Sequence, residues 1–159
     1  LVVTVGEIHG GEARNIMAGL AYLTGTIRTW SDKTRKAMPE RLEHLIQRSA
    51  KAFNAKAKLT YQEGNAGLSN DSECAERCRK SVVKLFGEEA VSDYEGTLAG
   101  EDFSEYLDIV PGVFVFLGCR NPDVDAVYPQ HSGYYTVDES VLKNGAALAA
   151  QYAIDFLAE

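Results

Sequence analysis

The chain has 159 residues, of which 45% are apolar and 25% are charged, and its formal net charge is −7. This length fits one compact domain or two small ones, and the composition is that of a globular protein rather than a disordered, collagen-like or coiled-coil chain. No apolar stretch approaches the about 20 residues that a membrane span requires.

Two further features bear on the cellular compartment. The N-terminal sequence LVVTVGEIHGG lacks the basic region and cleavage site of a signal peptide, so export is not expected. The three cysteines lack C-x-x-C spacing, which favours reduced thiols over a disulfide framework. Both features predict a cytoplasmic protein.

The charge is unevenly distributed along the chain. Residues 1–65 carry ten Lys and Arg against six Asp and Glu, whereas residues 66–159 carry six against seventeen. We therefore expect two domains, residues 1–66 and residues 67–159. The acidic total and the lack of clustered Lys and Arg argue against a nucleic-acid partner.

The first half has the pattern of a sheet with a helix on one side. Strands are predicted over residues 1–8 and 20–30, followed by an amphipathic helix over residues 32–54 that starts at Ser31 or at Pro39. Residues 56–63, KAKLTYQE, alternate in polarity as a half-buried strand does. The predicted order is β-β-α-β.

The second half has a different pattern. Asn70 or Asp71 is expected to cap a helix that ends at Gly87, and residues 101–109 to form a short helix. Residues 113–117, VFVFL, are typical of a strand buried on both faces, as in parallel sheets. A T-x-x-E capping box at residues 136–139 predicts a last helix to Leu157. A lone buried strand implies that this half completes a sheet whose other strands lie elsewhere.

The chain offers few residues for a metal site. His44 lies on the polar face of the helix and His9 in a loop, which favours ordinary surface positions. His131 follows the predicted buried strand, where α/β proteins collect ligands. Cys74 and Cys78 are four residues apart on one helix face. This spacing favours two small buried hydrophobic residues, and the alternative is a pair of metal ligands. No zinc motif is present, so the chain supplies no obvious metal site by itself.

Four other polar residues have two possible interpretations each. Arg28 is either a solvated strand residue or a bidentate partner for a carboxylate, with the Asn15 amide as a further donor. Glu101 and Asp102 either complement the dipole of a short helix or belong to a site.

Five motifs occur in an order that resembles one known family. They are VGEIHGGEARNIM, which is similar to V-G-x-I-x-G-G-x-A-x-N-V-I-P, then GTIRT, GEDFSEYL and PGVFVFLG, and finally HSGYYTVDE, which is similar to H-S-P-x-F-x-V-D-E. Together they resemble the C-terminal part of the M20 metallopeptidases, in the amidohydrolase branch of hippurate, N-acetyl-diaminopimelate and auxin-conjugate hydrolases. Ala18, Gln130 and Gly133 depart from the pattern, which weakens assignment to a subfamily more than to the family.

The resemblance implies an α/β fold in two parts. Residues 1–66 would be the C-terminal part of a lid domain, with an antiparallel sheet and a helix, that mediates homodimerisation. Residues 67–159 would be the C-terminal segment of a zinc-peptidase-like α/β catalytic domain. The other metal ligands, the general base and a lid histidine would precede this sequence, so these residues alone are expected to be inactive.

The resemblance also implies roles for individual residues. His131 matches the last ligand of a centre with two divalent metal ions, zinc or manganese. Asn15 and Arg28 match a pair that holds the substrate's carboxylate and often reaches the partner subunit's active site, and Glu101 and Asp102 match a motif close to the site.

The implied activity is metal-dependent hydrolysis of the amide bond of N-acyl amino acids. The resemblance implies that the two metal ions would activate the water that attacks the amide carbonyl and would polarise the carbonyl oxygen. The alternative is a non-catalytic dimerisation or binding module built on the β-β-α-β half.

Overall fold

The computed structural model describes residues 1–158, which form two compact units. Unit 1 contains residues 1–68 and 96–105, and unit 2 contains residues 69–95 and those from 106 to the end of the described chain. Unit 1 combines a sheet with a helix, and unit 2 combines helices with long loops. The chain is therefore of mixed α/β class, as predicted.

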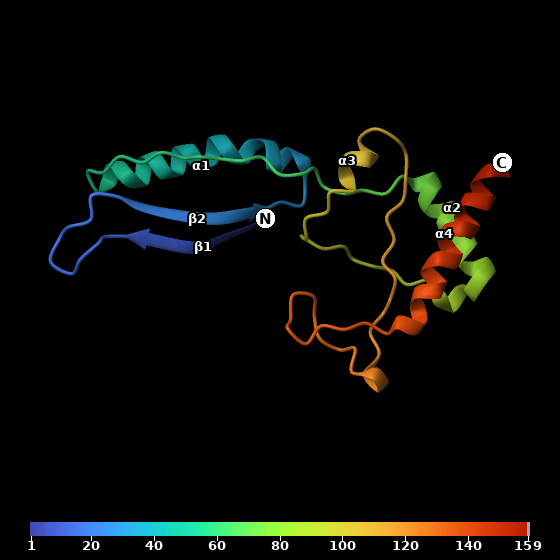
Figure 1. Ribbon diagram of the computed structural model, residues 1–159. Coiled ribbons are helices and arrows are strands. Elements are labelled where there is room, and N and C mark those ends of the chain that lie inside the picture. The colour runs from blue at the N-terminus through green and yellow to red at the C-terminus, as the bar shows by residue number, and fades with distance from the viewer. Residues whose placement is uncertain (159) are drawn as a thin grey trace. The chain divides into compact units, whose positions relative to one another are not determined.

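Unit 1 is built on an antiparallel hairpin of β1 (Val2–Gly10) and β2 (Ala21–Arg28). The register runs from Val2 opposite Arg28 to Gly10 opposite Ala21, with a β-bulge between Val5 and Glu7. Both strands confirm the prediction from sequence. The loop between them lies at the far end of the hairpin from the N-terminus (Figure 1).

Helix α1 (Asp32–Ala52) follows β2. The Ser31 side chain caps it by accepting a hydrogen bond from the Thr34 N–H at 3.3 Å. A start at Ser31 is thus confirmed, and the alternative start at Pro39 is wrong because Pro39 lies inside the helix. Met38 is buried at 5% exposure.

The strand predicted over residues 56–63 is not formed, and this prediction was wrong. Its burial alternates as expected, but no strand in the described residues pairs with it. The segment runs back along α1 instead (Figure 1), where Gln47 Nε2 donates to the Ala57 carbonyl at 3.0 Å and Arg35 Nη1 to the Gly64 carbonyl at 3.2 Å. Side chains of α1 therefore fix the backbone of this segment. Its alternating polarity did not provide the partner strand that a sheet requires.

The hairpin gives a direct test of the register. A Cβ at Gly25 would overlap the backbone carbonyl of Thr4, which cannot move without breaking the ladder. We expect Gly25→Ala to destabilise the fold by about 2 kcal/mol or more in urea unfolding. Gly6→Ala is the matched control, because the nearest atom to its Cβ is the Thr24 oxygen at 4.0 Å. Equal stability of the two variants would contradict this register.

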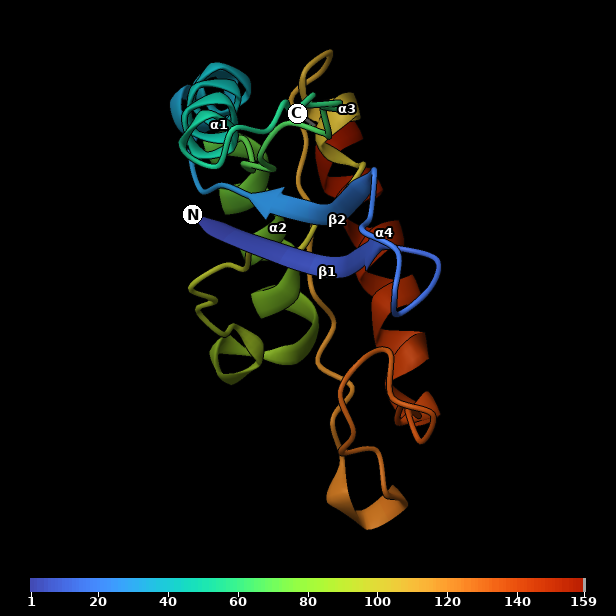
Figure 2. The ribbon, with the colours of Figure 1, turned by 90° about the vertical axis from the view of Figure 1, so that its left-hand side faces the viewer.

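Unit 2 centres on α2 (Ser72–Phe86) and α4 (Leu142–Leu157), which lie side by side in both views (Figures 1 and 2). Asp71 caps α2 by accepting from the Cys74 N–H at 2.9 Å, which lowers the pKa of the Asp71 carboxyl. Gly87, at φ 88°, follows its last residue as predicted. The short elements are η1 (Glu88–Ala90), α3 (Ser104–Leu107), η2 (Pro122–Val124) and η3 (Glu139–Val141).

The start of the last helix differs from the prediction. The expected capping box at Thr136 is wrong, because Asp138 is the cap and accepts from the Ser140 N–H at 2.9 Å. The Ser140 side chain above all, then the Asn121 amide, whose Nδ2 donates at 2.8 Å, and the Ser140 N–H lower the pKa of Asp138. A 3-10 turn then leads into α4.

Residues 113–117 do not form the predicted buried strand. Val115 and Phe116 are 46% and 59% exposed, and no strand in the described part of the chain flanks them. The Asn70 side chain takes the place of a neighbouring strand, since it donates to the Phe114 carbonyl at 2.9 Å and accepts from the Phe114 N–H at 2.8 Å. The apolar pattern is present, but a β-strand also needs a partner strand for its backbone hydrogen bonds.

A polar network joins α2 to α4. Ser81 is fully buried, and its hydroxyl donates to Asp155 Oδ2 at 2.7 Å. Lys84 Nζ lies 3.0 Å from Asp155 Oδ1, which also accepts from Gln151 at 2.7 Å. The Ser81 hydroxyl above all, and then Lys84, hold the pKa of Asp155 below its ordinary value.

This network predicts a pH dependence of stability. Because the pKa of Asp155 is lowered on folding, its contribution is complete above about pH 4 and is lost as the pH falls through the lowered value. Asp155→Asn should therefore reduce the free energy of unfolding at neutral pH and flatten its decline in acid, as measured by urea unfolding. The exposed Asp93→Asn serves as control. An unchanged acid decline in Asp155→Asn would refute the assignment.

Candidate functional site

The hairpin presents one polar face that ends at Arg28. Alternation along β2 places Thr24, Thr26 and Arg28 on the same side of the sheet. The β-bulge brings Glu7 onto this face, where its carboxylate accepts from the Thr24 hydroxyl at 3.0 Å. Without the extra residue, Glu7 would pair with Leu23 on the opposite, apolar face. The bulge therefore extends the polar face along β1.

Arg28 is held at the end of this face by the segment that follows Leu98. Its Nη1 donates to the Leu98 carbonyl at 3.1 Å, and a Cβ at Gly100 would lie 3.7 Å from the same nitrogen. A guanidinium anchored by one nitrogen is ordered, and its planar fork suits two parallel hydrogen bonds to a carboxylate.

The same segment carries Glu101, so unit 1 brings two of the predicted site residues into one region. The Glu101 carboxylate accepts from the Phe103 N–H at 3.1 Å, and its backbone carbonyl accepts from the Ser104 hydroxyl at 3.0 Å. The backbone carbonyl of Asp102 accepts a hydrogen bond from the Glu105 N–H at 3.0 Å. These contacts tie Glu101 to the turn that precedes α3, on the same segment as Leu98.

Asn15 lies at the opposite end of the hairpin from Arg28. It is exposed in the loop between β1 and β2, next to the pair Gly10 and Ala21, whereas Arg28 pairs with Val2. Seven residue steps along β2 correspond to roughly 23 Å. One copy of the hairpin therefore cannot place both side chains on a single carboxylate.

His131 lies in unit 2, in the loop that precedes α4. It is exposed, and its φ of 69° is in the left-handed region, which histidine tolerates better than most residues. The turn is closed by hydrogen bonds from the Ser132 N–H to the Pro129 carbonyl at 3.2 Å and from the Tyr135 N–H to the Ser132 carbonyl at 3.1 Å. Left-handed backbone at a non-glycine residue is a feature that concentrates at functional sites.

The described residues do not by themselves form a metal centre. Within residues 1–158 no three His, Cys, Asp or Glu side chains are grouped so that they could hold an ion. Cys74 and Cys78 are buried, and burial raises the pKa of the Cys78 thiol, which favours the structural interpretation of this pair. His131 is therefore not part of such a group within the described residues.

The sequence did not draw attention to two tyrosines in the same loop. Tyr128 and Tyr134 have ring centroids 5.5 Å apart, and Tyr134 is 77% exposed. Their equal spacing of three residues on either side of His131 is the signal that could have identified them.

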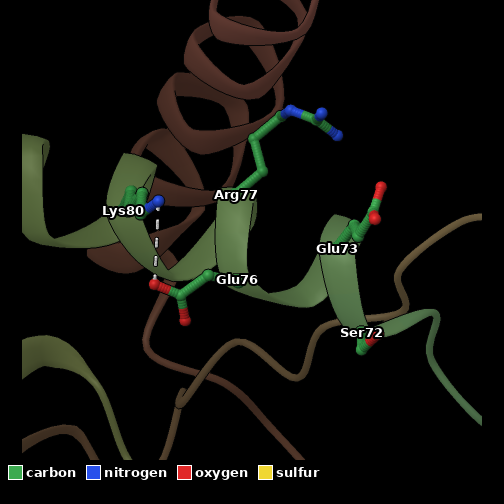
Figure 3. A pocket seen from close by; sticks show the side chains of 5 residues that line it. All are labelled: Ser72, Glu73, Glu76, Arg77 and Lys80. Carbon is green, nitrogen blue, oxygen red and sulfur yellow. Dashed lines mark ion pairs between the residues drawn. The ribbon is translucent and has the colours of Figure 1, made fainter.

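A hollow of about 360 Å³ lies elsewhere, along α2 (Figure 3). Its walls carry both charges, and Glu76 pairs with Lys80 at 3.9 Å; its lining residues are Ser72, Glu73, Glu76, Arg77 and Lys80. It contains none of the residues that the sequence singled out. A second hollow, of about 320 Å³, is formed mainly by residues 107–112 and contains none of the candidate substrate- or metal-binding residues.

No helix within residues 1–158 combines the length and the apolar character that crossing a bilayer requires.

One family of known proteins matches residues of both units. The description "Peptidase family M20/M25/M40" matches residues 2–155. The chain belongs to this family. The match covers both the Arg28 hairpin and the His131 loop, so the sequence motifs and the family assignment agree.

Several M20 relatives are similar over nearly the whole chain. Thermostable carboxypeptidase 2 of Saccharolobus solfataricus is 31% identical over 98% of this chain and 39% of its own length. The IAA-amino acid hydrolase ILR1-like 2 of Arabidopsis thaliana is 30% identical over 99% of this chain and 36% of its own length. N-acetyl-L-cysteine deacetylase of Bacillus subtilis is 30% identical over 89% of this chain and 32% of its own length. The chain thus spans less than two fifths of the length of these relatives.

A solved structure confirms the fold. The Bacillus subtilis YXEP protein, described as a dinuclear metal binding peptidase from the M20 family, superposes with a TM-score of 0.85. The superposition covers 98% of this chain and 42% of the other, at 24% sequence identity. The predicted α/β fold of an M20 peptidase is therefore confirmed for these residues.

Proposed function

We propose that this chain is the C-terminal portion of a metal-dependent amidohydrolase that hydrolyses the amide bond of N-acyl amino acids. The family match over residues 2–155 carries the proposal. Two relatives are named for related chemistry, as an N-acetyl-L-cysteine deacetylase and an IAA-amino acid hydrolase. In this proposal residues 1–66 belong to a lid domain and residues 67–159 to the catalytic domain.

In this proposal Arg28 binds the carboxylate of the amino-acid half of the substrate. The Leu98 carbonyl fixes one guanidinium nitrogen, which orients the fork and reduces the side-chain entropy lost on binding. The Asn15 amide adds a neutral donor, and Glu101 stabilises the turn that precedes α3, on the segment whose Leu98 carbonyl anchors Arg28. These residues bind and orient the substrate, and orientation of this kind lowers the barrier of a subsequent step.

Because the length of β2, roughly 23 Å, separates Arg28 from the end of the hairpin that carries the Asn15 loop, we propose that the two residues meet in one site only across a homodimer. Each site would take Arg28 from one subunit and Asn15 from the other. The exposed apolar face of the hairpin, which includes Val3, Ile8 and Leu23, supports further packing of unit 1 in the complete protein.

The dimer makes a specific prediction for mixed subunits. Asn15→Ala and Arg28→Ala homodimers should both be nearly inactive, because every site lacks one donor. Co-expression of the two variants should restore up to about a quarter of wild-type activity, since about half of the dimers are mixed and each has one intact site. The measurement is the activity of the whole co-expressed dimer population, per subunit. No recovery would mean that both donors come from one subunit or do not share a site.

We propose His131 as one ligand of a centre with two divalent metal ions, zinc or manganese. The described residues do not complete that centre, so its remaining ligands must lie outside them. The three free cysteines are consistent with the cytoplasmic location that we also propose.

The test of the activity uses the full-length protein loaded with zinc or with manganese. We expect it to release free amino acid from a panel of N-acyl amino acids. Matched N-acyl amines without the carboxylate should be poor substrates, because Arg28 then has no partner. Failure to hydrolyse any member of the panel with either metal would refute the proposed activity.

The alternative function is a non-catalytic dimerisation module. It is favoured only by the hairpin, whose apolar face is exposed and whose β1 edge has no partner within residues 1–158. Both possibilities predict a dimer, which light scattering on the 159-residue chain detects, so the hydrolysis assay separates them. A stable dimer without hydrolysis by the full-length protein would support this module.

A further inference from the structure

The backbone of residues 96–100 is held at two points by side chains at the end of the hairpin, all within unit 1. Gly96 lies beside Trp30, because a Cβ at Gly96 would be 3.0 Å from Cη2 and 3.4 Å from Cζ2 of the indole. Two residues later, the Leu98 carbonyl accepts from Arg28 Nη1 at 3.1 Å. The stretch that anchors Arg28 is therefore also in contact with Trp30.

Gly96 is suited to its contact with Trp30 for two reasons. Its φ of 86° is in the left-handed region, which residues with a Cβ rarely adopt. Its missing side chain also leaves room for the indole, since a Cβ 3.0 Å from the ring would crowd it. The ring thus approaches this backbone more closely than any other residue type at position 96 would allow.

The backbone between Gly96 and Leu98 continues into a closed turn. The Thr97 hydroxyl accepts from the Ala99 N–H at 3.3 Å, and this turn encloses Leu98. A displacement of Gly96 is therefore passed on to the Leu98 carbonyl, and from it to the Arg28 guanidinium that the carbonyl holds.

Trp30 has little other structural work in unit 1. It is 64% exposed, so most of its ring lies outside any core. Single exposed aromatic residues are ordinary on protein surfaces. Trp30 differs because the outer edge of its ring meets the backbone that anchors Arg28. Its removal should loosen residues 96–100 and leave the hairpin folded.

We propose that Trp30 is a positioning residue for Arg28. Its ring packs on Gly96 and thereby fixes the Leu98 carbonyl, which orients the guanidinium for the substrate's carboxylate. This inference rests on the proposed function, in which Arg28 binds that carboxylate. Trp30 acts only through Arg28 and contacts neither the substrate nor the reacting atoms.

The kinetic test uses the full-length enzyme with an N-acyl amino acid and the matched N-acyl amine. Trp30→Ala should lower kcat/KM for the N-acyl amino acid about three- to tenfold, mainly through KM, because a loosely held fork binds a carboxylate less well. The N-acyl amine should change by less than about twofold. Phe53→Ala is the control: Phe53 is 85% exposed directly after α1, and its removal should change neither value.

A double-mutant cycle shows whether Trp30 acts through Arg28. In an Arg28→Ala background, Trp30→Ala should cause no further loss on the N-acyl amino acid, because the group that it positions is gone. Losses that multiply would overturn the inference, since Trp30 would then act independently. An equal loss on both substrates in the single variant would overturn it as well, because Trp30 would then only support the fold.

Gly96→Ala tests the same contact from the other side. The added Cβ meets the indole in a strained backbone conformation, so kcat/KM for the N-acyl amino acid should fall at least threefold while the N-acyl amine changes little. Gly67→Ala is the matched control, because no atom lies within 4 Å of a Cβ at that position of unit 1. Wild-type kinetics in Gly96→Ala would contradict the proposed contact.

Hydrogen exchange of the full-length protein, followed by mass spectrometry, tests the positioning without reference to activity. Trp30→Ala should speed exchange at residues 97–99 at least about threefold and leave the amides of β1 and β2 within about twofold. If the enzyme hydrolyses neither substrate, or if Arg28→Ala has no effect, the proposed function fails, and faster exchange at residues 97–99 still supports the contact. Unchanged exchange there would overturn the role of Trp30.

Discussion

Replacing Arg28 with alanine in the full-length enzyme is expected to lower kcat/KM for N-acyl amino acids roughly a hundredfold or more. Two charge-assisted hydrogen bonds to the substrate's carboxylate are lost, and each contributes about 1.5–3 kcal/mol. Substrates without the carboxylate should be affected only slightly. Because the residue does not contact the metal centre in this account, the metal content of the purified enzyme should stay at the wild-type level.

Two further variants separate charge from geometry. Arg28→Lys keeps the positive charge but loses the planar fork, so its activity should fall between that of the wild type and Arg28→Ala. Arg41→Ala removes an exposed arginine from α1 and should leave kcat/KM unchanged. A similar decrease on substrates with and without the carboxylate would show that Arg28 supports the fold of unit 1 through Leu98 instead.

The second large effect is expected at His131. His131→Ala should reduce metal content toward one ion per subunit and lower kcat about a thousandfold or more, since one imidazole ligand of the proposed pair is lost. Metal analysis of the purified protein and steady-state kinetics measure the two effects. Excess metal in the assay should restore only part of the activity.

His131→Asn separates ligation from folding. Asparagine tolerates the left-handed backbone that residue 131 adopts, so the midpoint of thermal unfolding of the metal-free protein should change by no more than about 2 °C. Metal content should nevertheless fall as in His131→Ala. His44→Ala, on the exposed side of α1, is the control and should retain both ions. Full metal content in His131→Asn would contradict the assignment.

Local signals in the sequence predicted most of the helices. The apolar spacing of residues 32–54 and the cap at Ser31 are short-range properties, and α1 forms where they indicate. The same is true of α2 between Asp71 and Gly87. A helix satisfies its backbone within its own segment, so its sequence pattern is sufficient evidence.

The predicted strands at residues 56–63 and 113–117 failed for the opposite reason. Their alternating and continuous apolar patterns are present, but a strand also requires a neighbour, and no local pattern specifies one. Side chains of α1 hold the first segment, and Asn70 holds the second. The capping box failed more narrowly, because Asp138 is an equally good cap two residues after Thr136.

The candidate site was only partly accessible from the sequence. Resemblance to a family singled out Arg28, Asn15 and His131, and their residue types alone left ordinary surface roles open. The hairpin register then separated Arg28 from Asn15, which no spacing in the sequence reveals. Tyr128 and Tyr134 became visible only when the turn at His131 brought their rings together.

The most direct test of the account is the position of the metal ions relative to His131. A crystal structure of the full-length protein with zinc, phased or checked by anomalous scattering, locates the ions without reference to activity. The account predicts an anomalous peak about 2.1 Å from a ring nitrogen of His131. Two fully ligated ions with the His131 ring in contact with neither would contradict it.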